Sequence, residues 1–567
     1  MKKILILLLL AATTCLAQDI IIGDPTEPCG PIRPDYWIGR HDNPIILRNV
    51  PCPASEESRI TGKRQTVSRQ TANADSYSFG SNVRVNDDPP GTSFKTPYSS
   101  GGHAIAARGD TVYLVWRSDC LGTSTIYFDK STDSGNTWGT DVQITDSDSG
   151  AIMPALALGK DGTIYVSWTD FRHITRQIYF AKSTDGGSIF TPGVHVQSAT
   201  PDKQQYSSIA VNDSGYIFIA YEDFRNLATT AIDIYCSRST DGGNSFEPSV
   251  RVDDCPDSIA QWGPCVAAKD SNVYISWTDF RTQYINGSKI FFAKSINLGA
   301  TFEPNVLVVD TVGMPIRVES NSSLVVDNSR IYVSWGYGHI RFTKSLNNGQ
   351  TFVAPNIYLV DAAGSLYNQN YPSLTCDDSG GVYCAWEDRR NGSAYPWLIY
   401  FNYSKNYGDS FATNNIHVDD RSLSEEVQLG APTICANKGG KVFCAWDDNR
   451  INHGGLLLDI YVTAGILTGI EGEPPNSFSH ETTSLQLHPN PFRQQANIKY
   501  GVGTNSFIQL KIYNIAGQLV KTLDEGYKTA GNYKINWNQH QGFSTGVYFV
   551  CLHMGNKSIT QKIIKIK

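Results

Sequence analysis

The sequence lacks the patterns that mark several large classes of protein. It has no long run of basic residues and a net charge of −7, which argues against a nucleic-acid partner because phosphate binding needs a basic patch. It has no CxxC pair and no histidine cluster at zinc spacing, so we predict no metal site and no cofactor. Only 4 Met accompany 29 Tyr, 23 Phe, 11 Trp and 49 Gly, a composition typical of aromatic strands joined by tight turns. The chain is therefore predicted to be all-β.

Long hydrophobic segments are absent except at the start of the chain. Lys2 and Lys3 precede an apolar run over residues 4–12 and a small-residue end at residues 15–17, which are the three regions of a signal peptide. The run is too short to cross a bilayer, and no other segment approaches the length of a transmembrane helix. We therefore predict a signal peptide over residues 1–17, no membrane span, and a secreted protein or one on the outer cell surface.

Eleven cysteines follow residue 17, an odd number for a compartment in which disulfides persist. Cys29 and Cys52 are predicted to bridge the irregular N-terminal segment, residues 18–77. Two further pairs fall at similar places in adjacent repeats: Cys376 with Cys384, and Cys435 with Cys444. Each of these pairs is either a cross-strand disulfide or two small buried hydrophobic side chains.

A short β-run that ends in an aromatic residue and a polar cluster, Trp-x-Asp-x-Arg, recurs along the chain. The copies begin at Trp168, Tyr221, Trp277, Trp386 and Trp446, with degraded copies at Trp116 and Trp335. A period of about 50 to 60 residues with several strands per unit is typical of a β-propeller, because one such unit cannot bury both of its faces alone. We predict a propeller over residues 78–468.

The strands of the repeat can be counted independently. The second- and third-strand patterns each occur seven times, whereas the fourth-strand pattern occurs six times after residue 112. Residues 83–87, upstream of the first repeat, copy residues 250–254 of a fourth strand. This early strand is predicted to complete the blade that ends at residues 460–462 and to close the ring. Seven blades are predicted, with six as the alternative if the unit around Trp335 is not a full blade.

A second motif, Ser-x-Asp-x-Gly-x-x-aromatic, lies between the third and fourth strands. Its six copies occupy residues 131–138, 183–190, 239–246, 295–302, 345–352 and 404–411, with Asn in place of Asp in the last three. Asp or Asn can bond the backbone of its own turn and Gly accepts positive φ, so the motif is predicted to fasten a hairpin rather than to bind a ligand. These copies resemble the Asp-box, or bacterial neuraminidase repeat, of the sialidase-like propellers.

The two motifs are predicted to lie on opposite faces, because turns between antiparallel strands alternate between the two ends of a blade. The resemblance implies that a site lies on the face opposite the Asp-boxes. Five aspartates occupy equivalent places on that face: Asp170, Asp223, Asp279, Asp388 and Asp448. We therefore interpret each as bonding its own loop and a nearby arginine so that it fixes blade against blade. The Trp residues are interpreted as packing between blades.

Departures from the repeat supply candidate site residues. The unit at Trp335 lacks both polar partners, and the loop before it carries Arg317 and Glu319. Polar amides that alternate with exposed rings are typical of surfaces that bind sugars, and also of surfaces that bind peptides. The predicted ligand-binding residues are Arg317, Glu319, Tyr206, Trp262, Tyr371, Arg172, Arg225 and Arg281.

The resemblance to sialidases does not extend to their catalytic pattern. As the resemblance implies, that mechanism needs three arginines, a tyrosine nucleophile with its glutamate, and an aspartic acid. The expected Arg-Ile-Pro signature is absent, and residues 31–33 read it in reverse outside the repeats. We favour a secreted propeller that binds a glycan or protein ligand. One alternative is a glycoside hydrolase with a non-standard site, for which Glu319 and Asp279 are candidate carboxylates; another is a structural surface repeat protein.

The chain changes character after the propeller. Residues 469–484 are a linker by composition, and residues 485–567 predict a small β-sandwich. Pro-Asn-Pro-Phe at residues 489–492, Tyr-Asn-Ile-Ala-Gly at 513–517 and Thr-Gly-Val-Tyr at 545–548 resemble the C-terminal sorting domain of type IX secretion substrates and related immunoglobulin-like modules. The resemblance implies export machinery as a partner. The alternative is an accessory immunoglobulin-like domain without a sorting role.

Overall fold

The computed structural model describes residues 76–566, apart from gaps at residues 100, 102, 174, 197–202, 282–286, 311–320, 328–329, 337, 362–368, 391–396, 422–428, 452–456, 469–484, 489–491, 494, 503–505, 516–517, 529–530, 539–543 and 555–556. The predicted signal peptide and the predicted bridge between Cys29 and Cys52 lie outside the described residues. Within the described ranges every regular element is a β-strand, as the composition predicts, and none is a helix long and apolar enough to cross a bilayer. The chain divides into two compact units, residues 1–470 and 471–567.

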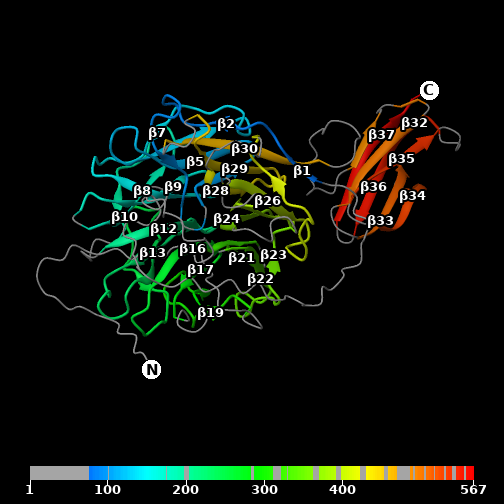
Figure 1. Cartoon of the computed structure of the whole chain (residues 1–567). Coiled ribbons are helices and arrows are strands. Elements are labelled where there is room, and N and C mark those ends of the chain that lie inside the picture. Colours follow the sequence, from blue (N-terminus) through cyan, green and yellow to red (C-terminus); the bar gives the residue numbers. More distant parts are fainter. Residues whose placement is uncertain are drawn as a thin grey trace, which may run out of the picture. The chain divides into compact units, whose positions relative to one another are not determined.

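In the described part of the first unit the strands form seven sheets, in which each strand is antiparallel to its neighbours (Figure 1). Five sheets have four strands each. These are β8 (Ala151–Leu158), β9 (Ile164–Asp170), β10 (Gln177–Ser183) and β11 (Val194–His195); β12 (Gln204–Val211), β13 (Ile217–Asp223), β14 (Asp233–Ser239) and β15 (Val250–Arg251); β16 (Gln261–Lys269), β17 (Asn272–Asp279), β18 (Lys289–Ser295) and β19 (Val306–Leu307); β20 (Ser323–Val326), β21 (Ile331–Gly336), β22 (Ile340–Ser345) and β23 (Ile357–Tyr358); and β24 (Gln369–Cys376), β25 (Val382–Asp388), β26 (Leu398–Ser404) and β27 (Ile416–His417).

The other two sheets of this unit have five strands each. One contains β3 (Lys95–Thr96), β4 (Ile105–Arg108), β5 (Thr111–Ser118), β6 (Thr125–Ser131) and β7 (Val142–Gln143); the other contains β1 (Ser76–Phe79), β2 (Val83–Arg84), β28 (Leu429–Ala436), β29 (Val442–Asp448) and β30 (Asp459–Thr468). Each sheet is named below by the first strand of its repeat: β4, β8, β12, β16, β20, β24 or β28.

The sheets are arranged like the blades of a propeller. The first strands contact one another in order from β4 to β28, and β28 contacts β4. Apolar side chains fill the space between neighbouring sheets. Trp168 of the β8 sheet, with none of its surface exposed, shares one hydrophobic cluster with Val115, Ile126 and Phe128 of the β4 sheet. This confirms the interpretation of the repeated Trp as packing between blades.

The early strand closes the ring as the sequence predicts. In β2, Val83 pairs with Val462 and Arg84 with Tyr461, so the strand adds to β30 of the last sheet. Arg84 also approaches Asp459, at 3.3 Å. A second early strand, β1, pairs with the far end of β30 and was not predicted.

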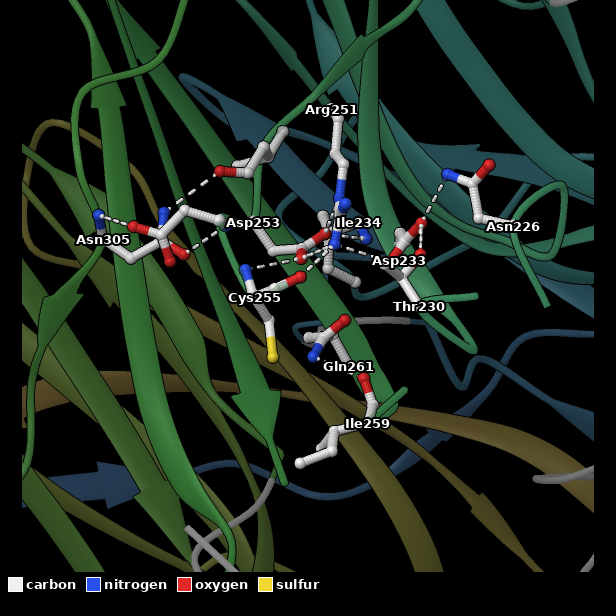
Figure 2. Close-up of polar contacts among 12 residues, drawn as sticks. Asn226, Thr230, Asp233, Ile234, Arg251, Asp253, Cys255, Ile259, Gln261 and Asn305 are labelled. Carbon is white, nitrogen blue, oxygen red and sulfur yellow. Dashed lines mark hydrogen bonds and ion pairs between the residues drawn. The ribbon is translucent and has the colours of Figure 1, made fainter. Parts of the chain in front are cut away.

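The contact of Arg84 copies one made inside the ring. In the β12 sheet, Arg251 lies between Asp233 and Asp253, at 2.9 Å and 2.7 Å (Figure 2). Arg251 occupies the same place on a fourth strand as Arg84, and Asp233 the same place on a third strand as Asp459. The closing strand therefore forms the side-chain contact that a strand of continuous sequence forms.

The unit around Trp335 has a complete sheet. Its four strands, β20 to β23, pair in the usual order, and Trp335 is fully buried. The loss of the polar motif there has not removed a strand.

The Ser-x-Asp turns have the geometry that the sequence predicts. In the first copy, Ser131 Oγ accepts a hydrogen bond from Gly135 N at 2.8 Å, and Asp133 Oδ1 accepts one from Thr137 N at 2.9 Å. The turns also contact the preceding sheet, because Lys182 Nζ donates to the carbonyl oxygen of Gly242 in the next turn at 2.7 Å. Each turn therefore fastens its own hairpin and contacts the neighbouring sheet.

The four cysteines of the two predicted pairs, Cys376 with Cys384 and Cys435 with Cys444, are free thiols. Cys384 stands opposite Leu374, so Cys376 is only its diagonal neighbour across the strand pair. Cys435 stands opposite Phe443, which places its side chain on the other face of the sheet from that of Cys444. All four pack in hydrophobic clusters, so they serve as small hydrophobic side chains and form no cross-strand disulfide.

The second unit consists of two sheets. One contains β31 (Leu485–His488), β32 (Gln495–Val502) and β35 (Gly531–Asn538); the other contains β33 (Ser506–Asn514), β34 (Leu519–Lys528), β36 (Gly546–Met554) and β37 (Lys557–Lys565). Ile498 and Trp537 of the first sheet share a core with Ile508 and Val550 of the second. Two sheets around one core make the small sandwich that the sequence predicts.

We predict that Gly187→Ala destabilises the first unit more than Gly215→Ala. Gly187 has φ +91°, and a Cβ there would lie 2.1 Å from Cε1 of buried Phe128 in the preceding sheet, whereas Gly215 has φ +81° and nothing within 4 Å. Left-handed strain alone costs about 1–2 kcal/mol, and overpacking adds about 1–3 kcal/mol. Denaturant unfolding should give a clearly larger loss for Gly187→Ala. Equal losses would contradict the packing of this turn against the preceding sheet.

Candidate functional site

The Trp-x-Asp-x-Arg motif forms a hydrogen-bonded node at the end of each second strand that carries it. In β17, Asp279 accepts from Trp277 Nε1 at 3.0 Å, from Arg281 N at 2.8 Å and from Arg281 Nε at 2.9 Å. The same pattern recurs at Asp170, and both aspartates have none of their surface exposed. The contacts confirm that these carboxylates bond their own loop and a nearby arginine.

The arginines of these nodes reach beyond their own loop, and two of them contact the neighbouring sheet. Arg281 lies 4.2 Å from the centroid of the Phe291 ring, and its guanidinium donates to Asp254 at 2.7 Å and to Asn305 at 3.0 Å. Arg172 lies over Tyr179 and reaches Asp146, while Arg225 lies over Tyr235 and reaches Ser249. The structure therefore places Arg172 and Arg281 in contacts that hold neighbouring sheets together, whereas the contacts of Arg225 lie within its own sheet. A ligand-binding role for them stays a prediction.

The first strand of five sheets carries a β-bulge near its start. A residue with positive φ stands at the bulge in four of them: Met153, Tyr206, Gly263 and Tyr371. For a bulky residue this conformation costs about 1–2 kcal/mol, so a repeated contact must hold it. That contact is a hydrogen bond to the preceding sheet: Tyr206 N donates to Thr169 Oγ1 at 3.1 Å, and Asn321 N, also at positive φ, donates to Thr278 Oγ1 at 3.2 Å.

Glu222 replaces the threonine in the β12 sheet. One of its oxygens accepts from Gly263 N at 2.8 Å and the other from Gln205 Nε2 at 2.9 Å, and only 2% of the residue is exposed. Burial raises the pKa of Glu222 to about 7, although its hydrogen bonds oppose the shift. Glu222 is therefore a carboxyl group that holds its proton through most of the acidic range.

A continuous set of contacts connects Glu222 with three successive sheets. Arg176, before β10, lies over the Phe171 ring at 5.0 Å and donates to Gln205 Oε1 at 3.0 Å. Beyond the bulge at Gly263, Trp262 packs edge-on against Phe280 at 4.6 Å. Phe171, Arg176, Gln205, Glu222 and Trp262 are called the mouth cluster below. Its members combine a guanidinium, an amide and a carboxyl group with two half-buried rings.

Residues 97–99, 101, 103 and 104, called the plug segment below, contact first strands on several sides of the ring. Tyr98 lies 5.6 Å, ring to ring, from Tyr371 of β24, and the carbonyl oxygen of Gly101 accepts from Ser323 Oγ of β20 at 2.7 Å. A Cβ on Gly101 would lie 2.4 Å from Cys265 Sγ of β16. The segment therefore reaches strands on several sides of the ring.

The same segment continues through contacts with β8 and β28. The carbonyl oxygen of His103 accepts from Leu156 N at 2.8 Å, and Ala104 N donates to Thr433 Oγ1 at 3.0 Å. Burial lowers the pKa of His103 to about 4 and raises that of the adjacent Cys265 to about 12. The pair is an uncharged imidazole beside a thiol, which suits packing rather than nucleophilic chemistry.

The structure brings some of the predicted site residues together. Trp262 belongs to the mouth cluster, and Tyr206, with 4% of its surface exposed, packs with Ile152, Met153, Tyr98 and Phe171 next to it. Tyr371 contacts Tyr98. Asp279 lies in the node described above. Arg317 and Glu319 lie outside the described residues.

Glu222 was not among the predicted site residues, although the sequence carries a signal at this place. The residue after the motif aromatic is Thr169 and Thr278 in two repeats, and a carboxylic acid in three others: Glu222, Glu387 and Asp447. This place therefore varies between neutral and acidic residues, and the variation is the signal that could have drawn attention to Glu222. Among the described residues, no group of three or more His, Cys, Asp or Glu could hold a metal ion.

Comparison with known families identifies the second unit. Residues 486–567 match the family of secretion system C-terminal sorting domains. This confirms the resemblance to the sorting domain of type IX secretion. The protein is therefore secreted or exposed on the outer cell surface. No curated protein matches the sequence.

Several solved structures are similar to the chain at low identity. A protein of unknown function from Dyadobacter fermentans has 14% identity and a TM-score of 0.42, covering 69% of this chain and 99% of that one. An ulvan lyase of polysaccharide lyase family PL25 has 11% identity and a TM-score of 0.46, covering 68% and 96%. An α-L-arabinanase from Penicillium chrysogenum has 15% identity and a TM-score of 0.40, covering 68% and 98%. These likenesses are too distant to assign an activity.

We predict that Asp279→Asn lowers stability, because its carboxylate joins Trp277 to Arg281 in a buried node. Loss of charge-assisted hydrogen bonds of this kind costs about 1.5–3 kcal/mol. Asp213→Asn, which removes an exposed ion pair with Lys269, should cost at most about 1 kcal/mol. Urea unfolding of both variants compares the two effects. A stability for Asp279→Asn equal to that of the parent would contradict a structural role.

We also predict a pH-dependent effect of Glu222→Gln. The pKa of this group is raised in the folded state from 4.5 to about 7, so its contribution to stability is complete below pH 4.5 and is lost as the pH rises to about 7. The amide variant lacks this loss, which in the parent lowers the free energy of unfolding by at most about 1.4 kcal/mol per pH unit. In thermal unfolding from pH 4 to 8, the unfolding temperature of the variant should rise relative to that of the parent until about pH 7. Glu303→Gln, at an exposed carboxylate, is the control.

Proposed function

We propose that the protein is a secreted or cell-surface propeller of seven blades that binds a glycan or protein ligand at the mouth cluster, on the face opposite the Asp-boxes. The described sheets support seven blades because each has at least four strands, including the β20 sheet around Trp335. The pairing of β2 with β30 supports a closed ring.

One observation carries the proposal: the chain of contacts from Arg176 through Gln205 and Glu222 to Gly263. It spans three sheets and fixes polar groups beside the half-buried rings of Phe171 and Trp262. Rigid polar groups beside rings suit a sugar, whose apolar face packs on an aromatic ring while its hydroxyl groups exchange hydrogen bonds. The same groups suit a peptide.

The plug segment restricts how a ligand can bind. Tyr98 contacts Tyr371, and Gly101 contacts Ser323 across the ring. A chain-like ligand therefore lies across the mouth and is not threaded through the ring. Tyr206 and Tyr371 are proposed to line the mouth, and Arg317 and Glu319 remain proposed ligand residues of the loop before the Trp335 unit.

A glycan array followed by titration of the best ligand tests the proposal. We expect Trp262→Ala and Arg176→Ala each to weaken binding about tenfold or more. Ile189→Ser is the matched control, because Ile189 is 72% exposed on an Asp-box turn. Affinity lost with Ile189→Ser and retained in both mouth variants would reject the mouth as the site.

The raised pKa of Glu222 favours a glycoside hydrolase as the second candidate, because a general acid needs a carboxyl group that is protonated near neutral pH. Turnover of a broad panel of aryl glycosides, lost in Glu222→Gln while ligand binding persists, would establish an enzyme. Binding without turnover across the panel would reject the hydrolase and support the binding protein.

A further inference from the structure

Neighbouring sheets are joined by a reciprocal clasp beside their fourth strands. At the junction of the β12 and β16 sheets, Asp254 N donates to Asn305 Oδ1 at 2.8 Å and Asn305 N donates to Asp254 Oδ2 at 3.0 Å. Asp361 with Asn415, and Asp420 with Asn82, form the same clasp at two other junctions. In each of these three clasps one partner is an acid and the other an amide.

The amide contributes a donor that an acid lacks. At the junction of the β20 and β24 sheets, Asn415 Nδ2 donates to the carbonyl oxygen of Leu359 at 2.8 Å, and Asn402 Nδ2 donates to the same oxygen at 2.9 Å. Arg390 also donates to Asn415 and Asp361. Two amides and one guanidinium therefore hold this junction together at any pH.

The junction of the closing strand with the β4 sheet differs at all three places. Asp87 N donates to Asp141 Oδ2 and Asp141 N to Asp87 Oδ2, both at 2.9 Å, so the clasp joins two acids. Asp141 takes the place of Asn415. Asp129 takes that of Asn402, because Asp129 stands opposite Leu114 as Asn402 stands opposite Cys384. Cys120, four residues after Trp116, stands where Arg390 follows Trp386.

The nearby cations are bound to other groups. Lys95 lies 2.8 Å from Asp88, Arg84 lies 3.3 Å from Asp459, and Lys130 Nζ donates to the carbonyl oxygen of Gly186. Among the described residues, none of Asp87, Asp129 and Asp141 forms an ion pair. The groups that face one another across this junction are therefore mainly acidic: Asp87 and Asp88 from the closing strand, with Asp129 and Asp141 from the β4 sheet.

A carboxyl group can replace the donating amide only when it carries a proton. Burial, with a smaller contribution from the charge of Asp87, raises the pKa of Asp129 to about 6 and that of Asp141 to about 7. The two groups therefore bind protons in a range in which an exposed aspartate has lost its own.

We propose that Asp129 and Asp141 form a proton-operated latch, which holds the closing strand against the β4 sheet when both are protonated and loosens this junction when they ionise. The latch does not depend on the proposed ligand site. Its direction follows from linkage: the folded-state pKa lies above the ordinary value of 3.8, so the stabilisation is complete below about pH 4, falls as the pH rises to about 7, and is constant above that.

The test uses the full chain and Asp129→Asn/Asp141→Asn, which restores the amides found at the β20–β24 junction. We expect the unfolding temperature of the parent to fall relative to this variant between pH 4 and 7, with a constant difference above pH 7. Asn402→Asp/Asn415→Asp, at the β20–β24 junction, should acquire a similar but smaller pH dependence because Arg390 is present. Parallel profiles for the parent and the restored variant would overturn the proposal.

A measurement on the parent alone guards against variants that fail to fold. Val85 N donates to the carbonyl oxygen of Ile460 at 2.9 Å in the closing strand. Hydrogen exchange of this amide, corrected for intrinsic rate and compared with amides of β13, should show protection that decreases from pH 5 to pH 8. Protection that changes equally in both strands would count against the latch.

Discussion

The pairing of β2 with β30 is the contact on which the rest of the first unit depends. Each sheet has two apolar faces, so it is stable only between two neighbours, and the first and last sheets have neighbours only if the ring closes. The closing strand supplies backbone hydrogen bonds to β30 and side-chain contacts such as that of Arg84 with Asp459. Without this strand β30 would present an open edge, and the mouth cluster would lose its fixed frame.

Two kinds of residue can be separated once the ring is described. Residues that recur at equivalent places, such as Asp279 and Arg281, hold sheets together. Residues at places that vary among the repeats, such as Glu222 and Asp141, have pKa values that are raised because their carboxyl groups are buried. Repetition therefore identifies the framework, and the variable places supply the candidates for a site.

Much of the fold could be predicted because its signals are local. The strand patterns, the turn chemistry of Ser131 and Gly135, and the copy of residues 250–254 at residues 83–87 are all written in neighbouring residues. The candidate site was predicted less well: Trp262 belongs to the mouth cluster and Tyr206 packs beside it, but Glu222, Gln205 and Arg176 come from three separate segments. No local pattern indicates that these three side chains touch.

The sequence by itself determined the all-β class, the repeat, the closing strand and the sorting domain at residues 486–567, because alternation, turn residues and motif order are properties of short segments. Only the tertiary structure decided which polar side chains are buried and what they contact. The plug segment illustrates the reason: Tyr98 and Gly101 meet strands more than 200 residues away, at Tyr371 and Ser323. Such contacts, and the pKa values that follow from them, exist only after the ring has closed around them.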